Sequence, residues 1–436
     1  MSVDPRYQPH VEDEHGDEPS CKHSPNPPFD AVVEAIDEVV VPEGYSVQAI
    51  LQFGEPITGT MPGYAVGNTG DEQAMQVGAH HDGIHFFPID GSSTDGLLVM
   101  NHEYVEPRFM HETAIGQAMS RSDVPMLADG RRDDDEVDKE LHAHGVSIAR
   151  VREGEGRVWE VVEDPRNRRI HGLTPMRIAG PVAGSDFVET KYSPTGETTR
   201  GTLNNCAHGV TPWNTYLAAE ENWAGYFSNL DQEDQKPNLP REHARYGVRT
   251  GTSRYAWELA AGGADEHRRF DVSTKGADAT EDYRNEPNGF GWMVEIDPFD
   301  PESSPVKRTW LGRFAHEGVI FAAAVEGEPV VCYSGDDARF EYIYKFVSAA
   351  PYEAATASGE LLEDGRLYVA RFNDDGTGEW LPLVFGEGPL TEANGFTSQA
   401  DVLVNTRLAA DTVGATKMDR PEWGAVDPAN GDVYFN

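Results

Sequence analysis

The stretch Gly291-Trp292-Met293-Val294-Glu295-Ile296-Asp297-Pro298 joins a short apolar run to an abrupt turn signal. Runs of this length that are rich in aromatic and β-branched residues, bounded by Gly, Asp or Pro, are typical of strands. We expect the next strand near Thr309-Trp310-Leu311-Gly312, and Ala425-Val426-Asp427-Pro428 repeats the pattern before Gly431-Asp432-Val433-Tyr434. A strand, an Asp-Pro turn and a second strand form the hairpin pattern of β-propeller blades, and an irregular β-sandwich is the alternative.

Similar apolar runs recur along the chain between turn signals. They predict further strands at residues 83–87, 96–100, 156–162, 215–219, 329–334, 340–347 and 365–372. The 44 Gly and 29 Pro residues favour many turns and short strands over long helices. The sequence therefore predicts an all-β fold of the β-propeller type with inserted helices and long loops.

The insertions and the N-terminus interrupt this pattern. Short helices are expected near 109–117, within 120–141 and over 400–410, and 246–259 belongs to a large excursion read as a lid or an edge helix. Residues 1–41 are acidic and rich in Pro and His at their start, which predicts a disordered arm with weak helical character over Phe29–Val41. Residues 42–436 are then expected to form one propeller-like domain.

The chain is strongly acidic. Its net charge is −40, from 75 Asp and Glu against 35 Lys and Arg, and only eight of the basic residues are Lys. Such self-repulsion is weakened by salt, so we favour a protein adapted to high salt over a merely acidic one. Binding to nucleic acid is not expected, and an anionic substrate would need a local positive site made of metals and Arg.

The three cysteines, Cys21, Cys206 and Cys332, give no disulfide framework. Cys332 lies in an apolar run and is expected in the core, and Cys21 lies in the arm. The sequence has no 18-residue apolar run, so no membrane span is expected, and no signal peptide is visible at the N-terminus.

Several polar runs with metal-binding side chains follow apolar or Gly-rich stretches. They are Asn101-His102-Glu103, Asn204-Asn205-Cys206, Glu220-Glu221-Asn222, His316-Glu317-Gly318 and Asp419-Arg420-Pro421-Glu422. Carboxylate and amide oxygens suit hard cations such as Ca²⁺, while a thiolate suits a transition metal such as iron. Four of these runs lie roughly a hundred residues apart, so only tertiary folding could unite them in one mixed metal site. The run Glu220-Glu221-Asn222 follows Cys206 within the length of one hairpin, which predicts that Cys206 and the Glu pair lie near the same end of a sheet.

Each run also has a simpler interpretation. Asn101 and Glu103 could belong to an ordinary capped turn, and Cys206 could be a small buried side chain. Glu317 opens an apolar run, where an unpaired carboxylate is costly and calls for a metal or another cation. His316 and the run His80-His81-Asp82 are read as supporting or surface residues.

Two polar loops could each bind a ligand or could be purely structural. Arg420 and Glu422 flank Pro421, so this rigid loop could clamp a phosphate or form a structural ion pair. Asp336-Asp337-Ala338-Arg339-Phe340-Glu341 lacks the spacing of an EF-hand and is read as a turn with an Arg–Asp pair.

Taken together, the motifs resemble the PhoX family of alkaline phosphatases from about Val41 to the last residue. The matching runs include Leu98-Val99-Met100-Asn101-His102-Glu103-Tyr104, Gly201-Thr202-Leu203-Asn204-Asn205-Cys206-Ala207, Gly335-Asp336-Asp337 and Ala415-Thr416-Lys417-Met418-Asp419-Arg420-Pro421-Glu422-Trp423. The resemblance implies a six-bladed β-propeller that hydrolyses phosphomonoesters with a cofactor of Fe³⁺ and Ca²⁺ ions.

The resemblance also implies roles for individual residues. Cys206 matches the iron-binding thiolate, and Glu221, Glu317 and Glu422 match metal-binding carboxylates. Arg420 matches an Arg that binds the substrate phosphate. A further family motif contains Asn101 and Glu103, which we include among the metal-site candidates.

Two departures from the family bear on these expectations. Family members continue past the last motif through strands that complete the ring, so the resemblance implies an incomplete propeller ending at Asn436. The family is exported by a twin-arginine signal, which is not visible before Val41, and its members are monomers. The alternative function is a non-catalytic, Ca²⁺-binding propeller or an inactive phosphatase fragment; the expected partners of the enzyme are small phosphorylated substrates.

Overall fold

The computed structural model describes residues 39–58, 63–115, 123–230 and 239–436. The chain divides into two units, Met1–Ala49 and Ile50–Asn436. The described residues of the first unit contain a turn at Glu43 and Gly44 and no helix or strand. The predicted disordered arm and most of the expected Phe29–Val41 helix lie outside the described residues. The second unit carries every element discussed below.

The second unit consists mainly of β-sheet. A five-stranded sheet contains β1 (His81–Pro88), β2 (Asp95–His102), β3 (Gly145–Glu153), β4 (Trp159–Val162) and β5 (Arg168–Ile170). A six-stranded sheet has the order β7 (Thr198–Arg200), β6 (Pro175–Ala179), β11 (Val306–Arg308), β10 (Met293–Ile296), β9 (Tyr216–Glu220) and β8 (Asn205–Val210). Another five-stranded sheet has the order β12 (Ile320–Phe321), β13 (Pro329–Gly335), β15 (Ile343–Pro351), β16 (Gly365–Phe372) and β17 (Gly378–Pro382). Two further pairs join β14 (Arg339–Glu341) to β18 (Met418–Asp419) and β19 (Gly424–Val426) to β20 (Val433–Phe435).

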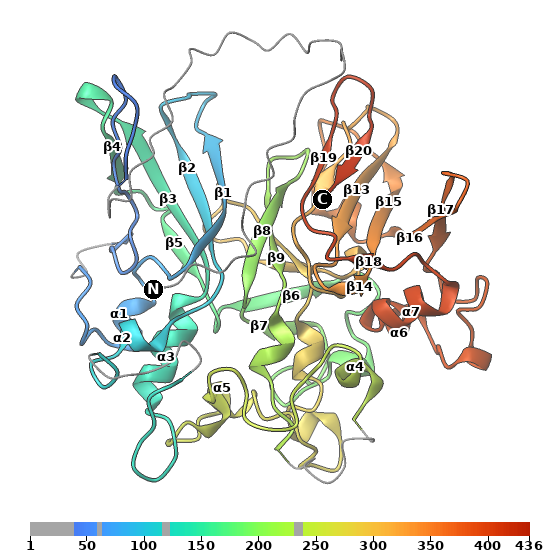
Figure 1. Cartoon of the computed structure of the whole chain (residues 1–436), viewed down its shortest axis with the longest axis horizontal. Helices are drawn as coiled ribbons and strands as arrows, with labels where there is room; N and C mark the ends of the chain where they lie inside the picture. Colours follow the sequence, from blue (N-terminus) through green and yellow to red (C-terminus); the bar gives the residue numbers. More distant parts are fainter. Residues whose placement is uncertain (1–38, 59–62, 116–122, 231–238) are drawn as a thin grey trace, which may run out of the picture. The chain divides into compact units, whose positions relative to one another are not determined.

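The helices are short, and Figure 1 shows most of them towards one end of the sheets. They are α1 (Gly70–Gln73), α2 (Pro107–Met110), α3 (Asp134–Ala143), α4 (Arg241–Ala244), α5 (Asp265–Arg268), α6 (Gln399–Val404) and α7 (Thr406–Val413). The best-defined start is that of α3, where the Asp133 carboxylate accepts hydrogen bonds from two amides of the first turn.

The central strands β9 and β10 of the six-stranded sheet are buried on both faces, which explains why their sequences are almost continuously apolar. On one face, Leu217 and Met293 pack in a core with Tyr344 and Phe346 of the third sheet. On the other face, residues of β9 and β10 pack in a second core with Phe87, Leu97 and Val146 of the first sheet. Figure 1 shows β8 and β9 between β1–β3 and β13–β15. The strand ends of all three sheets are thereby brought together.

The two Asp-Pro repeats form hairpins as predicted. β10 pairs with β11 in antiparallel register, and β19 pairs with β20. The second strand of the first hairpin lies slightly earlier than expected, because Thr309–Leu311 forms a 3-10 turn that leads into Gly312, a residue with φ of 86°. The other predicted strands are also present, with ends displaced by a few residues, but the strand expected over 340–347 is divided into β14 and β15, which belong to different sheets. The prediction of a mainly β fold with inserted helices is confirmed.

The helix expectations were less accurate. The expected helix at 109–117 is reduced to α2, and the segment 246–259 is not an α-helix, since only Trp257–Leu259 forms a 3-10 turn. Gly247 and Ala256 adopt positive φ angles, which end helical geometry on both sides. The predicted 400–410 helix is present, but a non-helical Asn405 divides it into α6 and α7.

The excursion around residue 257 is attached to α3 by a buried ion network. Glu140 is fully buried and pairs with Arg132 at 2.5 Å and with His111 at 2.8 Å. Its second oxygen accepts a hydrogen bond from the Trp257 indole at 2.7 Å. Burial alone would raise the pKa of Glu140, but Arg132 and His111 outweigh it and hold the pKa at about 2. The ionised carboxylate therefore links three segments.

We predict that Glu140→Gln lowers the free energy of unfolding by about 3 kcal/mol, because Arg132 would remain buried without its counter-charge. The pKa of about 2 lies below the ordinary value of 4.5. The stabilisation is therefore complete above pH 4.5 and is lost as the pH falls towards 2. Denaturant unfolding at several pH values checks this. A deficit in the variant that stays constant down to pH 2 would contradict the assignment.

Candidate metal centre

The β8–β9 hairpin brings two of the predicted ligands to one strand end. Asn205 pairs with Glu220, so Cys206 and Glu221 lie close together beside this pair, as the hairpin prediction required. Glu220 itself is directed elsewhere, since its buried carboxylate pairs with the equally buried Lys307. Of these two adjacent glutamates, Glu220 is thus a structural residue and Glu221 belongs to the candidate site.

Asn204 fixes the geometry at the start of the hairpin. It adopts a left-handed conformation with φ of 53°, which Asn tolerates better than most residues. Its carbonyl accepts a hydrogen bond from the Glu221 amide at 3.0 Å, and its side-chain oxygen accepts one from the Asn222 amide at 2.6 Å. Its side-chain nitrogen donates to the Glu103 carbonyl at 3.3 Å. One residue therefore holds two acidic segments in place.

Glu317 joins this group from the segment that precedes β12. The Cys206 thiol donates a hydrogen bond from Sγ to Glu317 Oε1 at 3.2 Å. One potential ligand atom each from Cys206, Glu221 and Glu317 lies within 4.8 Å of the other two. The neighbouring His316 is buried and hydrogen-bonded to Ser334 and to the Gly312 carbonyl, so it supports the segment, as expected.

A second group shares the same sulfur. Ligand atoms of Asp82, Glu103 and Cys206 also lie within 4.8 Å of one another. The sequence interpretation of Asp82 as a surface turn residue missed it. The available signal was strand pairing, because the match of His81 with His102 puts Asp82, near the start of β1, and Glu103, just past the end of β2, at the same end of this strand pair.

Gly83 allows the close approach of β1 to β8. A Cβ atom at this position would lie 2.9 Å from the Ala207 carbonyl carbon and 3.0 Å from Asn101 Nδ2. A larger residue would therefore push the strands apart. The absence of a side chain at Gly83 thus helps to bring Asp82 within reach of Cys206.

The acidic groups perturb one another. Burial raises the pKa of the Cys206 thiol far above its usual range, and Glu317 and Glu221 raise it further. Burial and the charge of Glu317 raise the pKa of Glu221 to about 9. Burial also raises the pKa of Glu317 to about 7, despite the hydrogen bond from Cys206, and that of Asp82. Such a cluster holds protons unless a cation replaces them.

Two buried oxygens give an independent test of whether cations fit. Glu317 Oε2 and Asp337 Oδ1 are buried and have no hydrogen-bond partner among the described residues. A buried carboxylate oxygen without a partner carries a large desolvation cost, which metal coordination would offset. Several carboxylates with a single sulfur also match a mixture of hard cations and iron. The side chains therefore fit the metals implied by the sequence.

The predicted ligand Asn101 has a different set of contacts. Its side-chain nitrogen donates to the Cys206 carbonyl at 2.6 Å and to the Ala207 carbonyl at 2.8 Å. Its side-chain oxygen accepts a hydrogen bond from the Tyr216 hydroxyl at 2.9 Å. Asn101 thus fastens β2 to the strand that carries the thiol. The prediction that it binds metal stays a prediction.

Arg420 and Glu422 lie beside the centre on the loop between β18 and β19. Arg420 adopts φ of 57° and pairs with Asp337 at 2.5 Å and with Glu422 at 3.2 Å. Its side chain is 53% exposed, which leaves donors free for a ligand. Gly335 permits this packing, because a Cβ there would meet the Pro421 carbonyl oxygen at 2.2 Å. Glu422 stands outside the two clustered groups.

The Arg–Asp pair predicted within the 336–341 turn is not formed there, because the charged residues of this turn pair with residues elsewhere. Asp336 binds Arg407 through both carboxylate oxygens, at 2.5 and 2.8 Å, and Asp337 binds Arg420. Arg339 approaches Asp419 only to 3.9 Å. Cys332 is 1% exposed in β13, which confirms its predicted place in the core.

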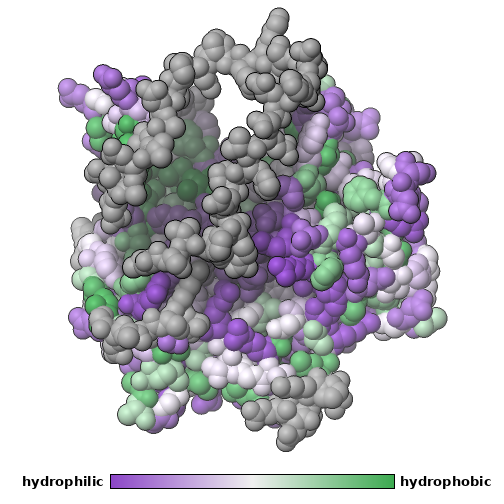
Figure 2. All heavy atoms as spheres, in the orientation of Figure 1, coloured by the Kyte–Doolittle hydropathy of each residue, from purple (hydrophilic) through white to green (hydrophobic). Residues whose placement is uncertain are grey.

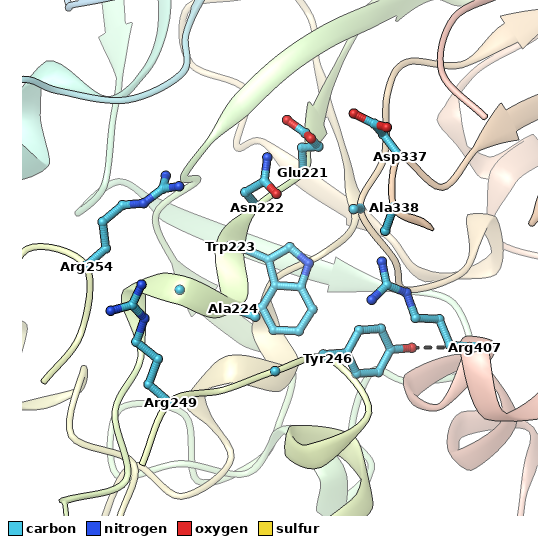
Figure 3. Close-up of a pocket in the computed structure, with 13 residues that line it drawn as sticks. Glu221, Asn222, Trp223, Ala224, Tyr246, Arg249, Arg254, Asp337, Ala338 and Arg407 are labelled. Carbon is cyan, nitrogen blue, oxygen red and sulfur yellow. Dashed lines mark hydrogen bonds between the residues drawn. The ribbon is translucent and has the colours of Figure 1, made fainter. Parts of the chain in front are cut away.

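A cavity of about 280 Å³ opens beside the centre. Its lining includes Glu221 and Asp337, and it also includes three arginines, Arg249, Arg254 and Arg407. Figure 3 shows Arg249 and Arg254 on one side of this pocket and Asp337 and Arg407 on the other. This pocket was not predicted from the sequence, because Arg249 and Arg254 come from an excursion that was read only as a lid or an edge helix, and Arg407 comes from α7.

The sequence and the fold match those of known proteins. The family model described as alkaline phosphatase PhoX matches residues 26–436. A solved structure, that of Pseudomonas fluorescens PhoX in complex with vanadate, a transition state analogue, is similar with a TM-score of 0.79 and 37% sequence identity. The similarity covers 91% of this chain and 65% of that protein, so this chain spans just under two thirds of its length.

Neither a curated relative nor, among the described residues, a membrane-spanning helix was found. Among curated proteins, none matches this sequence. Within the described ranges, no helix has both the length and the apolar character that crossing a membrane requires.

Proposed function

The chain belongs to the PhoX alkaline phosphatase family, and on this premise we propose that it hydrolyses phosphate monoesters at the centre formed around Cys206. The observation that carries the proposal is the sharing of one thiol by two groups of clustered carboxylates. The vanadate bound to the solved relative supports phosphoryl chemistry, since vanadate is a transition state analogue in that protein.

The metals we assign to the centre are Fe³⁺ and Ca²⁺. Cys206 would hold iron, and Glu221, Glu317, Asp82 and Glu103 would supply oxygen ligands. Glu422 and Asp337 border the same space and would complete the acidic shell. When bound, the metals would neutralise the phosphate charge and stabilise the charge of the transition state.

The chain's own residues orient the substrate. Arg420 projects from a strained backbone position and is held by Asp337, so its guanidinium is positioned before a ligand arrives. It would bind the oxygens of the transferred phosphoryl group, preferably through two donors. Asn101 would keep the Cys206 strand in register with β2, and Asn204 would hold Glu221. These contacts place the reacting groups without large rearrangement.

The wider architecture follows from family membership. We infer that the three large sheets are blades of a β-propeller that has six blades in the complete family fold, with residues 42–436 as its phosphatase-like part. Strand ends from several blades then meet near one axis, which accounts for ligands scattered through the sequence. We also infer export from the cell and a monomeric state, as in the family, and optimal function in high salt because of the charge of −40. Figure 2 shows hydrophilic residues over much of the face in view.

We predict that Cys206→Ala lowers both the iron content and kcat/KM for p-nitrophenyl phosphate by at least about 100-fold, because it removes the ligand common to both groups. Cys332→Ala is the matched control, since Cys332 lies in the apolar core and should retain metal and activity. Elemental analysis and kinetics in molar salt measure both effects.

Each of these measurements has an outcome that opposes the proposal. Unchanged activity in Cys206→Ala would exclude the proposed centre. Stoichiometric Ca²⁺ without iron, together with no turnover, would favour the alternative of a non-catalytic Ca²⁺-binding propeller.

For Arg420, we predict that Arg420→Ala lowers kcat/KM for p-nitrophenyl phosphate by about 100-fold and weakens vanadate inhibition in parallel. Arg420→Lys should recover only part of the loss, because Lys cannot form two parallel donor contacts. The control is Arg339→Ala in the neighbouring strand, whose side chain is 77% exposed. Equal losses in the Ala variants at 339 and 420 would show that general charge, rather than phosphate contact, accounts for the effect.

A further inference from the structure

The cavity beside the metal centre is lined by two arginines that lie outside the ion pairs of the described residues, although the charge of Glu103 acts on Arg254. Arg249 and Arg254 line it, both are exposed, and neither forms an ion pair with a described carboxylate. Arg254 lies over the Tyr226 ring, with its guanidinium carbon 5.6 Å from the ring centroid, and hydrogen-bonds to the Tyr226 hydroxyl. In a chain of net charge −40, such cations beside an acidic centre need an explanation.

The other arginines near this space are already neutralised. Arg407 binds both oxygens of Asp336, and Arg420 binds Asp337 and Glu422. An additional anionic group entering the cavity would therefore meet donors chiefly from Arg249 and Arg254. Figure 3 shows Arg249 and Arg254 on the side of the cavity opposite Arg407.

Hydrogen bonds of the main chain fix the backbone of Arg249 and Arg254. The Arg249 carbonyl accepts a hydrogen bond from the Asn229 amide at 2.8 Å, and the Arg254 amide donates to the Gly225 carbonyl at 2.8 Å. The buried Trp223 and Tyr246 line the cavity beneath them. Arg313 packs against both rings, with its guanidinium carbon 4.2 and 4.5 Å from their centroids, which stiffens this wall. The pocket is therefore built from fixed elements.

We propose that Arg249 and Arg254 form a subsite for an anionic group on the leaving group of the substrate, a carboxylate or a second phosphate. This rests on the proposed function. Glu221 and Asp337, which border the metal centre, line the same cavity as the two arginines. A substrate whose phosphoryl group lies at the centre can thus extend its second anion towards Arg249 and Arg254. The preferred substrates are small phosphomonoesters that carry two anionic groups.

Two substrates of nearly equal size provide the test. 3-Phosphoglycerate has a leaving group with a carboxylate, while glycerol 3-phosphate has an uncharged leaving group. We expect kcat/KM in the metal-loaded protein to favour 3-phosphoglycerate. In the double variant Arg249→Ala/Arg254→Ala, the ratio of the two kcat/KM values should fall by about ten-fold or more, since charge-assisted hydrogen bonds to the carboxylate are lost. Glycerol bisphosphate, tested in parallel, distinguishes a phosphate from a carboxylate as the preferred second anion.

Controls separate this effect from charge and folding. Arg157→Ala removes a cation whose side chain is 88% exposed on the first sheet, and it should leave the ratio unchanged. Arg249→Lys/Arg254→Lys should retain part of the preference. The single Ala variants are used if the double variant has a lower melting temperature.

The outcomes for the subsite and for the proposed function are distinct. A ratio that is the same in the wild type and the double variant overturns the subsite, while turnover of glycerol 3-phosphate still supports the phosphatase. If neither substrate is hydrolysed, the proposed function fails. Calorimetric binding of 3-phosphoglycerate to the metal-loaded chain then decides the subsite, which is supported by a ten-fold weaker affinity in the double variant and overturned by an equal one.

Discussion

Mutual repulsion among acidic groups that are at most partly exposed to water, with Glu221 the most buried, is the constraint on which the centre of this molecule depends. Asp82, Glu103, Glu221 and Glu317 all approach the sulfur of Cys206. Burial raises the pKa of the thiol, and the surrounding carboxylates raise it further, so protons or cations must balance the site. No arrangement of the apolar core requires such a cluster. Its cost is consistent with a site maintained for bound cations, which is the basis of the proposed phosphatase.

The packing of the surrounding sheets holds the clustered acidic residues in place. The central strands β9 and β10 of the six-stranded sheet are buried on both faces, so their ends cannot move without disturbing two cores. At the ends themselves, Gly83 permits the approach of β1, and left-handed Asn204 and Arg420 hold two loops in conformations that few residues adopt easily. The packing of the sheets therefore offsets the free-energy cost of the backbone strain and of the charge repulsion at the site.

The sequence predicted those features that depend on neighbouring residues. Alternating apolar runs and Asp-Pro turns marked the strands, and the hairpin geometry placed Cys206 beside Glu221. Asp82 was misread because its role depends on pairing between β1 and β2 and on approach to β8, neither of which is local. The edge helix considered for the excursion that contains residues 246–259 is not formed, because Gly247 and Ala256 adopt positive φ angles. The arginines of the cavity could not be predicted from the sequence, since only tertiary folding brings them beside the acidic cluster.

The central claim is that the sulfur of Cys206 binds a metal that the neighbouring carboxylates also surround. X-ray absorption at the iron edge measures this most directly, because sulfur and oxygen neighbours scatter differently. In the iron-loaded protein, the account predicts a sulfur atom bonded to iron and its loss in Cys206→Ser. Iron bound in the unaltered chain with only oxygen or nitrogen neighbours would contradict it.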